Sequence, residues 1–185
     1  MTEIQTVDLI INARWIIPVV PENTCLEDHA LVVNHGQIIA LLPQSAAKAG
    51  YRALETRELG EHLLIPGLIN THNHAAMSLL KGYADDTALQ TWLEQHIWPV
   101  EGRHVSANFV TEGTELAMAE MIKTGTTCFA DMYFYPEAAA AAADAAGMRA
   151  QITIPVLDFP CAWGSGPDEY LTKGQDVLSE FKDRD

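Results

Sequence analysis

The sequence predicts an α/β protein: the first part of a (β/α)8 barrel of the TIM type, preceded by a small β-sandwich-like domain. Two observations support this prediction. Residues 1–62 hold short apolar, β-branched runs separated by turn residues, which is typical of a small β domain. From residue 63 onward, apolar strands alternate with segments of helical periodicity, and this alternation favours parallel strands joined by helical crossovers. We therefore assign residues 1–62 to the N-terminal part of a β-sandwich and residues 63–185 to the barrel.

Short strands separated by turns are expected throughout the N-terminal domain. A helical turn is predicted around Ser45–Tyr51. The composition of Asn34-His35-Gly36 is that of a tight turn, so it predicts a hairpin and makes His35 an exposed turn residue and not a metal ligand. The expected strands are Val7–Ile11, Arg14–Val20, Ala30–Val33, Gln37–Leu42 and Glu55–Leu59.

Hydrophobic periodicity predicts three strand–helix units after residue 62. The clearest helix runs from Ser106 to Thr124, because Ser106 can cap its first turn and Gly125 stands where a helix-ending glycine is expected. A helix at Leu89–Ile97, ending at Trp98-Pro99, lies in a connection long enough to form a pocket wall. The other expected strands and helical segments are Leu63–Ile69, Ala75–Gly82, Thr126–Tyr133, Pro136–Ala146, Met148–Phe159 and Pro167–Lys182.

The number of strand–helix units is smaller than a closed barrel requires. A (β/α)8 barrel needs on the order of 250 residues, whereas residues 63–185 suffice for its first three units. We therefore expect an open sheet with an unpaired strand edge, which favours association.

Two histidines follow the apolar run that begins at Leu63. In an extended strand, His72 and His74 point to the same side and lie about 6.6 Å apart along the chain, so both imidazoles can reach one ion. A lone His-x-His pair is more often a pair of satisfied polar side chains than a metal site. The apolar run reads as a strand buried on both faces, and the C-terminal end of such a strand is where barrels place their chemistry. This context favours a metal site.

The composition excludes several classes of function. The formal net charge is −14 and there is no basic cluster, which argues against binding to nucleic acid or to an anionic membrane surface. The three cysteines lie far apart without a Cys-x-x-Cys pair, so neither a disulfide framework nor a thiolate zinc site is indicated. No apolar run is long enough to span a bilayer, and no leader segment is recognisable. We expect a soluble, cytoplasmic protein that acts on a small molecule.

Taken together, several short motifs resemble the amidohydrolase superfamily. Within it, they are most similar to the methylthioadenosine/S-adenosylhomocysteine deaminases and the related triazine hydrolases. The resemblance covers essentially the whole chain, as the N-terminal part of such a protein. The motifs are Pro66–His74, Met77–Gly82, Asp85-Asp86, Trp92-Leu93, Ile97–Glu101 and Asp131–Phe134.

The resemblance implies roles for individual residues. His72 and His74 match the two metal ligands of the first barrel strand, with zinc the expected ion and iron or another divalent metal an alternative. Glu101 matches a carboxylate that accepts hydrogen bonds from ribose hydroxyls, and Trp92 an aromatic residue near the nucleoside. Without the resemblance, Glu101 reads as a solvated charge and Trp92 as part of an apolar helix face. Asp131 is expected to be structural.

The implied activity is hydrolytic deamination of the adenine of 5′-methylthioadenosine to hypoxanthine, with release of ammonia. S-adenosylhomocysteine or adenosine is an alternative substrate, but Ile152–Val156 offers no cation for an amino-acid carboxylate, which favours the methylthio compound. The resemblance places the remaining metal ligands and the catalytic acid/base beyond Asp185, so no catalytic residue is expected within this chain. The full-length protein is expected to be a homo-oligomer. A guanine or pterin deaminase, a triazine hydrolase and an inactive fragment remain alternatives.

Overall fold

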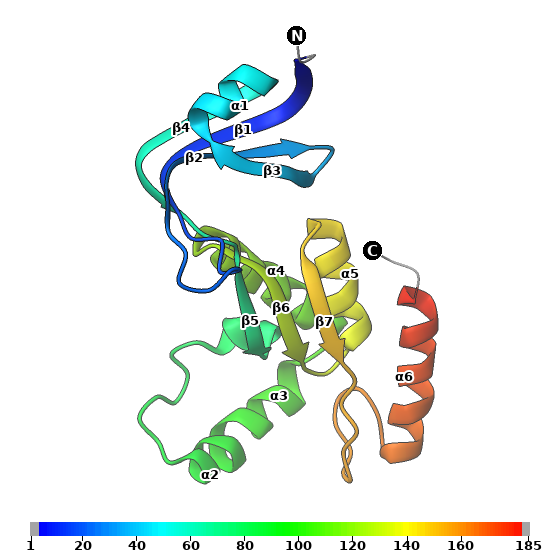
Figure 1. Ribbon diagram of the computed structural model, residues 1–185. Helices are drawn as coiled ribbons and strands as arrows, with labels where there is room; N and C mark the ends of the chain where they lie inside the picture. Colours follow the sequence, from blue (N-terminus) through cyan, green and yellow to red (C-terminus); the bar gives the residue numbers. More distant parts are fainter. Residues whose placement is uncertain (1–3, 183–185) are drawn as a thin grey trace. The chain divides into compact units, whose positions relative to one another are not determined.

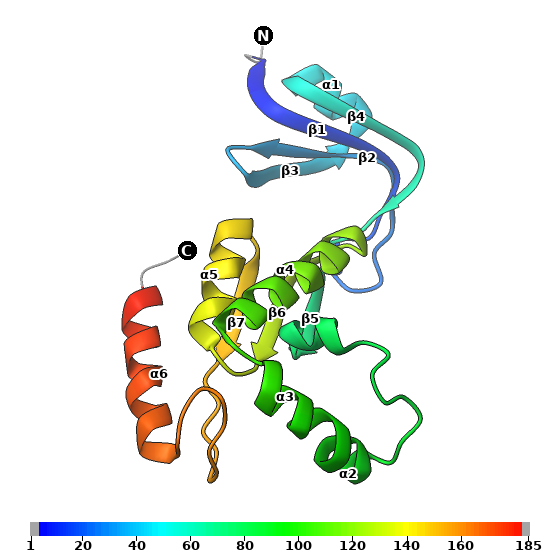
Figure 2. The same ribbon diagram turned by 180° about the vertical axis from the view of Figure 1, so that it is seen from behind.

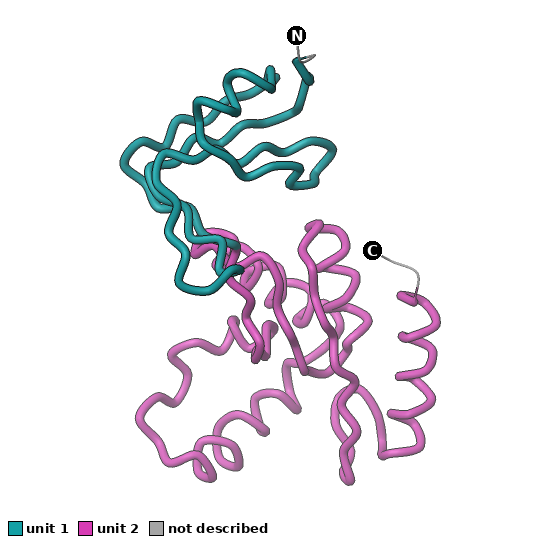
Figure 3. The backbone as a smooth tube through the Cα atoms, viewed as in Figure 1, with its two compact units in different colours: residues 1–66 teal, residues 67–185 magenta. Residues whose placement is uncertain are grey.

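The computed structural model describes residues 4–182 and divides into two compact units, residues 4–66 and residues 67–182 (Figure 3). Each unit has its own sheet. None of the helices in the described residues has the length and apolar character needed to cross a bilayer. The division between the units falls after Pro66, whereas the predicted boundary between residues 62 and 63 lies inside a strand.

The first unit is built on a four-stranded sheet with the order β3-β2-β1-β4 (Figure 1). Neighbouring strands are antiparallel except for β1 and β4, which are parallel. Apolar side chains on one face of this sheet pack with Ala47 of the short helix α1. The elements are β1 (Gln5–Ile16), β2 (Leu26–Asn34), β3 (Gln37–Pro43), α1 (Gln44–Gly50) and β4 (Tyr51–Leu64).

The predicted hairpin is confirmed, because Asn34 pairs with Gln37 across the turn, and His35 there is exposed with a positive φ of 48°. The separate strands expected at Val7–Ile11 and Arg14–Val20 are wrong: they form the single strand β1, which ends at Ile16. The sandwich itself stays a prediction, since the strands within residues 4–66 form one sheet.

The single strand expected from Leu63 to Ile69 is also wrong. Leu63 and Leu64 are the last residues of β4, and they pair with β1 in the first unit. Ile65-Pro66-Gly67 then interrupts the apolar run, since proline cannot donate to a strand ladder. The strand of the second unit begins only at Leu68.

The second unit alternates strands and helices, and its three strands form a parallel sheet with the order β5-β6-β7, as predicted. Their C-terminal ends therefore lie at the same edge of the sheet, as the arrowheads in Figure 1 show. Figure 2 shows the same unit from behind. The elements are β5 (Leu68–Asn73), α4 (Ala107–Lys123), β6 (Thr126–Met132), α5 (Pro136–Ala146), β7 (Arg149–Thr153) and α6 (Pro167–Phe181).

Helices α4 and α5 pack together against the sheet through a fully apolar core. Met118 and Met121 of α4, Phe129 of β6 and Ala142 of α5 belong to this one cluster of buried side chains. Helix α4 begins as predicted, because the Ser106 hydroxyl accepts a hydrogen bond from the Phe109 amide at 3.2 Å. Strand β7 is shorter than the predicted Met148–Phe159, because the chain leaves the ladder before Pro155.

Four short helical elements connect β5 to α4. The helix expected to end at Trp98-Pro99 continues instead, because Pro99 occupies the first turn of α3, where a missing N–H is tolerated. This continuation places Glu101 on a helix and not in a loop. The elements are η1 (Ala75–Leu80, a 3₁₀-helix), α2 (Leu89–Thr91), η2 (Trp92–Ile97, a π-helical turn) and α3 (Trp98–His104).

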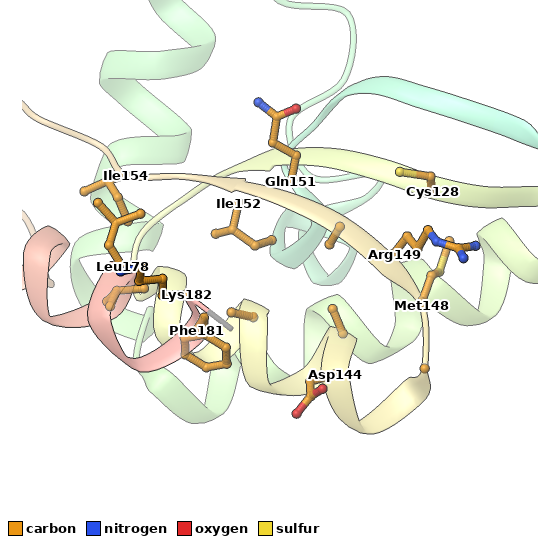
Figure 4. Close-up of a pocket in the computed structure, with 15 residues that line it drawn as sticks. Cys128, Asp144, Met148, Arg149, Gln151, Ile152, Ile154, Leu178, Phe181 and Lys182 are labelled. Atoms are coloured by element: carbon orange, nitrogen blue, oxygen red, sulfur yellow. The ribbon is translucent and has the colours of Figure 1, made fainter. Parts of the chain in front are cut away.

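A cavity of about 780 Å³ lies between β7, α5 and α6 (Figure 4). Gln151 and Ile152 of β7 line one side, and Leu178 and Phe181 of α6 line another. Among the described strands, β7 pairs only with β6, so the cavity adjoins the free edge of the sheet. None of the residues that the sequence assigns to a metal or substrate site lines this cavity.

Candidate metal and nucleoside site

The two histidines lie together at the C-terminal end of β5. His72 belongs to the strand and His74 follows its last residue. Their ring centroids are 5.1 Å apart and the ring planes are nearly perpendicular, at 83°. Two imidazoles at this separation can both direct a nitrogen at one ion between them, as the strand spacing predicts.

The orientation of His74 is set by the neighbouring strand. Its Nδ1 lies 2.7 Å from the main-chain carbonyl oxygen of Met132, at the end of β6. A carbonyl oxygen can only accept, so Nδ1 carries the proton and Nε2 keeps its lone pair. Such a bond from the second ring nitrogen is the usual way in which proteins fix the tautomer of a metal-binding histidine.

Asp131 supports the residues that follow His74. Its side chain is 2% exposed, and Oδ1 accepts a hydrogen bond from the Ala75 amide at 2.7 Å. Its other oxygen, Oδ2, is buried without a hydrogen-bond partner. Burial raises the pKa of this carboxyl, while the Ala75 hydrogen bond and the nearby His74 act in the opposite direction. The contact with Ala75 is the structural kind of role expected for Asp131.

Glu101 is buried beside the same strand end. It is 8% exposed, and its Oε1 accepts a hydrogen bond from the Tyr133 hydroxyl at 2.6 Å. Burial raises the pKa of Glu101, and this effect is opposed by the Tyr133 hydrogen bond and by the electrostatic effect of the nearby His74. Glu101 is therefore not the solvated charge that its position after Pro99 indicates by itself.

Three consecutive residues, the last two of β6 and the one that follows it, contact the residues of the candidate site. Asp131 contacts Ala75 through its side chain, and Met132 contacts His74 through its carbonyl. Tyr133 contacts Glu101 through its hydroxyl. The sequence by itself gives Tyr133 no individual role. The available signal was the alternation of a strand end, which places the side chains of residues two apart on the same face.

Trp92 lies in the connection between β5 and α4. It is the first residue of η2 and is half-buried. In the described part of the chain, neither a hydrogen bond nor a ring contact joins its side chain to His72, His74 or Glu101. Its assignment to nucleoside binding stays a prediction.

The donor set fits part of a divalent metal site. Two imidazoles suit zinc and other first-row metals, and His74 presents a fixed free nitrogen. Within residues 4–182, however, no group of three or more His, Cys, Asp or Glu side chains is placed to hold an ion. The described residues thus bring two potential ligands, His72 and His74, together at one strand end.

Comparison with protein families identifies the second unit. Residues 63–184 match the amidohydrolase family. Over all 185 residues, the chain is 54% identical to a 5-methylthioadenosine/S-adenosylhomocysteine deaminase of Saccharophagus degradans. It covers 42% of that protein, so the chain spans about two fifths of the length of such relatives.

Solved structures show the same fold. An adenosine deaminase from Xanthomonas campestris with bound zinc superposes with a TM-score of 0.95 at 40% identity, over 98% of this chain and 41% of that one. An atrazine chlorohydrolase from Arthrobacter aurescens complexed with zinc gives a TM-score of 0.81 at 16% identity, over 96% of this chain and 44% of that one. Because the identity to the atrazine chlorohydrolase is low, that comparison shows a similar fold and nothing more.

Proposed function

The chain belongs to the amidohydrolase family, and from this premise we propose that it forms the metal-binding and ribose-facing part of a hydrolytic deaminase of adenosine analogues. The main support is the geometry at the ends of β5 and β6. The ring centroids of the two imidazoles are 5.1 Å apart there, and α3 carries the buried carboxylate of Glu101, on which His74 acts electrostatically. The 54% identity to a deaminase of this substrate class supports the same reaction.

We propose that His72 and His74 hold zinc or another divalent ion. In such a site, the metal supplies Lewis acidity for the attack of water on the purine ring. The chain's own contribution is to fix the His74 tautomer through Met132 and to seat the turn after His74 through Asp131. We further propose that the other metal ligands and the acid/base group come from beyond Asp185, and we expect the 185-residue chain alone to be inactive.

For the substrate, we propose 5′-methylthioadenosine, with Glu101 accepting hydrogen bonds from the ribose hydroxyls and Trp92 packing near the nucleoside. Residues 154–166, which follow β7, contain no Lys or Arg that could pair with the carboxylate of S-adenosylhomocysteine. A higher kcat/KM for S-adenosylhomocysteine than for 5′-methylthioadenosine in the full-length gene product would contradict this preference.

The same proposal includes a complete barrel in the second unit and a β-sandwich in the first. Strands β5, β6 and β7 are the first three strands of an eight-stranded barrel, and the cavity beside the free edge of β7 is where the sheet continues. The sheet of residues 4–66 is part of a β-sandwich. A cytoplasmic location and a homo-oligomer stay predictions from the sequence.

The reaction is tested by the ultraviolet change that accompanies conversion of adenine to hypoxanthine. The full-length gene product with zinc is expected to convert 5′-methylthioadenosine, and the 185-residue chain with zinc is not. Turnover of guanine with none of the nucleoside would instead indicate a free-base deaminase. Turnover by the 185-residue chain would contradict the proposal that groups outside it are required.

The ribose contact is tested by Glu101→Gln in the full-length gene product. We expect kcat/KM for 5′-methylthioadenosine to fall roughly 10- to 100-fold, since a hydrogen bond to a charged acceptor is lost. Glu115→Gln is the matched control, because Glu115 lies exposed on α4. An equal effect of the two substitutions would remove Glu101 from the substrate site.

A further inference from the structure

The hydrogen bond between Tyr133 and Glu101 is buried at both ends. Tyr133 is 6% exposed and Glu101 8% exposed, and the hydroxyl lies 2.6 Å from Oε1. An ionised carboxylate can only accept, so the tyrosine hydroxyl is the donor. The bond therefore occupies one carboxylate oxygen and leaves the other, Oε2, available to a second donor.

The ring that carries this hydroxyl is held firmly. Tyr133 packs in an apolar cluster with Ala76, Val105 and Val110, and its ring centroid is 5.1 Å from that of Phe134. Val105 directly follows α3, so the same cluster also holds the end of the helix that carries Glu101. A donor fixed in this way restricts the rotation of the carboxylate as well as its position.

We propose that Tyr133 is a positioning residue for ribose recognition: its hydroxyl orients the Glu101 carboxylate so that Oε2 accepts from the vicinal 2′- and 3′-hydroxyls of the nucleoside. The inference rests on the proposed function, because it needs Glu101 to face the sugar. Selectivity for a ribose diol then depends both on α3, which supplies the acceptor Glu101, and on Tyr133, the residue after β6, which orients that acceptor.

The electrostatic environment of Glu101 is consistent with a role as hydrogen-bond acceptor that Tyr133 orients. Burial raises the pKa of the carboxyl, whereas the hydrogen bond from Tyr133 lowers it. A buried carboxylate that must stay ionised to accept hydrogen bonds from two hydroxyls is stabilised by a permanent hydrogen-bond donor. His74 lies close enough to act electrostatically on the same carboxyl. The Glu101 carboxylate therefore lies near the proposed metal ligands.

A purely structural role for the same bond makes a different prediction. If Tyr133 only anchored α3, its loss would lower stability and weaken every ligand to a similar degree. If it orients Glu101, its loss weakens only ligands that carry the diol. The discriminating quantity is therefore the preference for a nucleoside with both hydroxyls over one with neither.

The test uses inosine and 2′,3′-dideoxyinosine, which are already deaminated and bind without turnover. Calorimetric titration of the zinc-loaded full-length gene product gives their affinities for the wild type, Tyr133→Phe, Glu101→Ala and the double variant. We expect Tyr133→Phe to weaken inosine roughly tenfold and to leave dideoxyinosine unchanged. In the Glu101→Ala background, Tyr133→Phe is expected to have no further effect on the preference.

Two additional variants separate positioning from folding. Val105→Ala loosens the same apolar cluster without touching the hydrogen bond, so it is expected to lower the melting temperature and to keep the preference for inosine. Glu101→Asp keeps the charge but shortens the side chain, so that it loses contact with the tyrosine. It is expected to lose the preference, and it provides the test if Tyr133→Phe does not fold.

The outcomes distinguish this inference from the proposed function. A wild type without a preference for inosine would remove the ribose role of Glu101, and that of Tyr133 with it. A preference that Glu101→Ala abolishes but Tyr133→Phe retains would overturn the inference and leave the proposed function standing. Equal weakening of both ligands by Tyr133→Phe would show an anchoring role only. Retention of the preference in Glu101→Asp would also overturn it.

Discussion

The imidazole of His74 donates a hydrogen bond to the main-chain carbonyl of Met132, 2.7 Å away, although 58 residues separate the two in the sequence. Strand β6 thus sets the tautomer of a side chain that follows β5. Because the acceptor is a main-chain atom, the contact is independent of the side chain at position 132. It depends instead on the register between two parallel strands.

Removal of either histidine is expected to weaken zinc binding. His72→Ala and His74→Ala each delete a proposed ligand. The loss of affinity should be at least as large as the roughly 10- to 100-fold that follows removal of a group hydrogen-bonded to a metal ligand. Zinc titration against a competing chelator measures it in the full-length gene product. His62→Ala, on the exposed part of β4, is the control; an equal loss there would argue against a site at His72 and His74.

Asp131 is expected to contribute to stability through one hydrogen bond. Asp131→Ala leaves the buried amide of Ala75 without an acceptor, which costs about 1–3 kcal/mol in unfolding free energy. Asp131→Asn keeps an acceptor oxygen at the same place and is expected to cost less. Urea unfolding of the two variants without metal measures the difference. Equal losses would show that the negative charge matters and the hydrogen bond does not.

The raised pKa of Glu101 predicts a pH-dependent effect of Glu101→Gln. Because burial raises the pKa above the ordinary 4.5, the folded wild type binds its proton more tightly than the unfolded chain does. The stability from this group is therefore complete below pH 4.5 and is lost as pH rises through the folded pKa. Glutamine still accepts from Tyr133 and does not titrate.

The unfolding free energy of Glu101→Gln relative to wild type should thus increase between acid and neutral pH. Urea unfolding at several pH values measures this difference, with Glu115→Gln on the exposed face of α4 as the control. A difference that stays constant with pH would contradict the predicted effect. If the proposed ribose contact holds, the glutamine variant gains stability at neutral pH while it loses substrate affinity.

Gly113 is expected to tolerate no side chain. A Cβ there would meet the main chain of Ala76 in η1, lying 2.8 Å from its Cα and closer still to its carbonyl oxygen. Although Gly→Ala usually stabilises a helix, Gly113→Ala is expected to cost about 1–3 kcal/mol through overpacking.

Gly102→Ala is the matched control for this close approach, because Gly102 is also helical and has open space around its Cβ position. It is expected to stabilise by about 0.5–1 kcal/mol. Thermal melting compares the two. A gain in stability from both substitutions would show that α4 and η1 can move apart without cost.

The parallel strands, the helices between them and the position of the histidine pair were predictable, because each depends on local periodicity or spacing. The sequence did not reveal which sheet an apolar residue joins. Leu63 and Ile69 belong to one apolar run, yet they lie in different units, and Pro66 was the local sign of the break. Hydrophobicity reports burial but not the pairing partner.

The surroundings of Glu101 were not predictable from its neighbours. It lies two residues after Pro99 and precedes Gly102 and Arg103, a context that indicates exposure. Its burial depends on Tyr133, 32 residues away, and on the continuation of the helix past Pro99. A contact between distant residues leaves no periodic signal in either segment, so only the family resemblance pointed to this carboxylate.

The arrangement of Asp131, Met132 and Tyr133 has a consequence for how this site tolerates change. The three residues use different chemical groups, a carboxylate, a main-chain carbonyl and a phenol hydroxyl, and all three contacts depend on the register at the end of β6. A substitution at one position leaves the other two in place, whereas deletion of a single residue from β6 turns the alternate side chains to the opposite face. Deletion of a residue from β6 is therefore expected to be far more damaging than substitution of one. A scan of single-residue deletions should find almost none that is tolerated within Thr126–Met132.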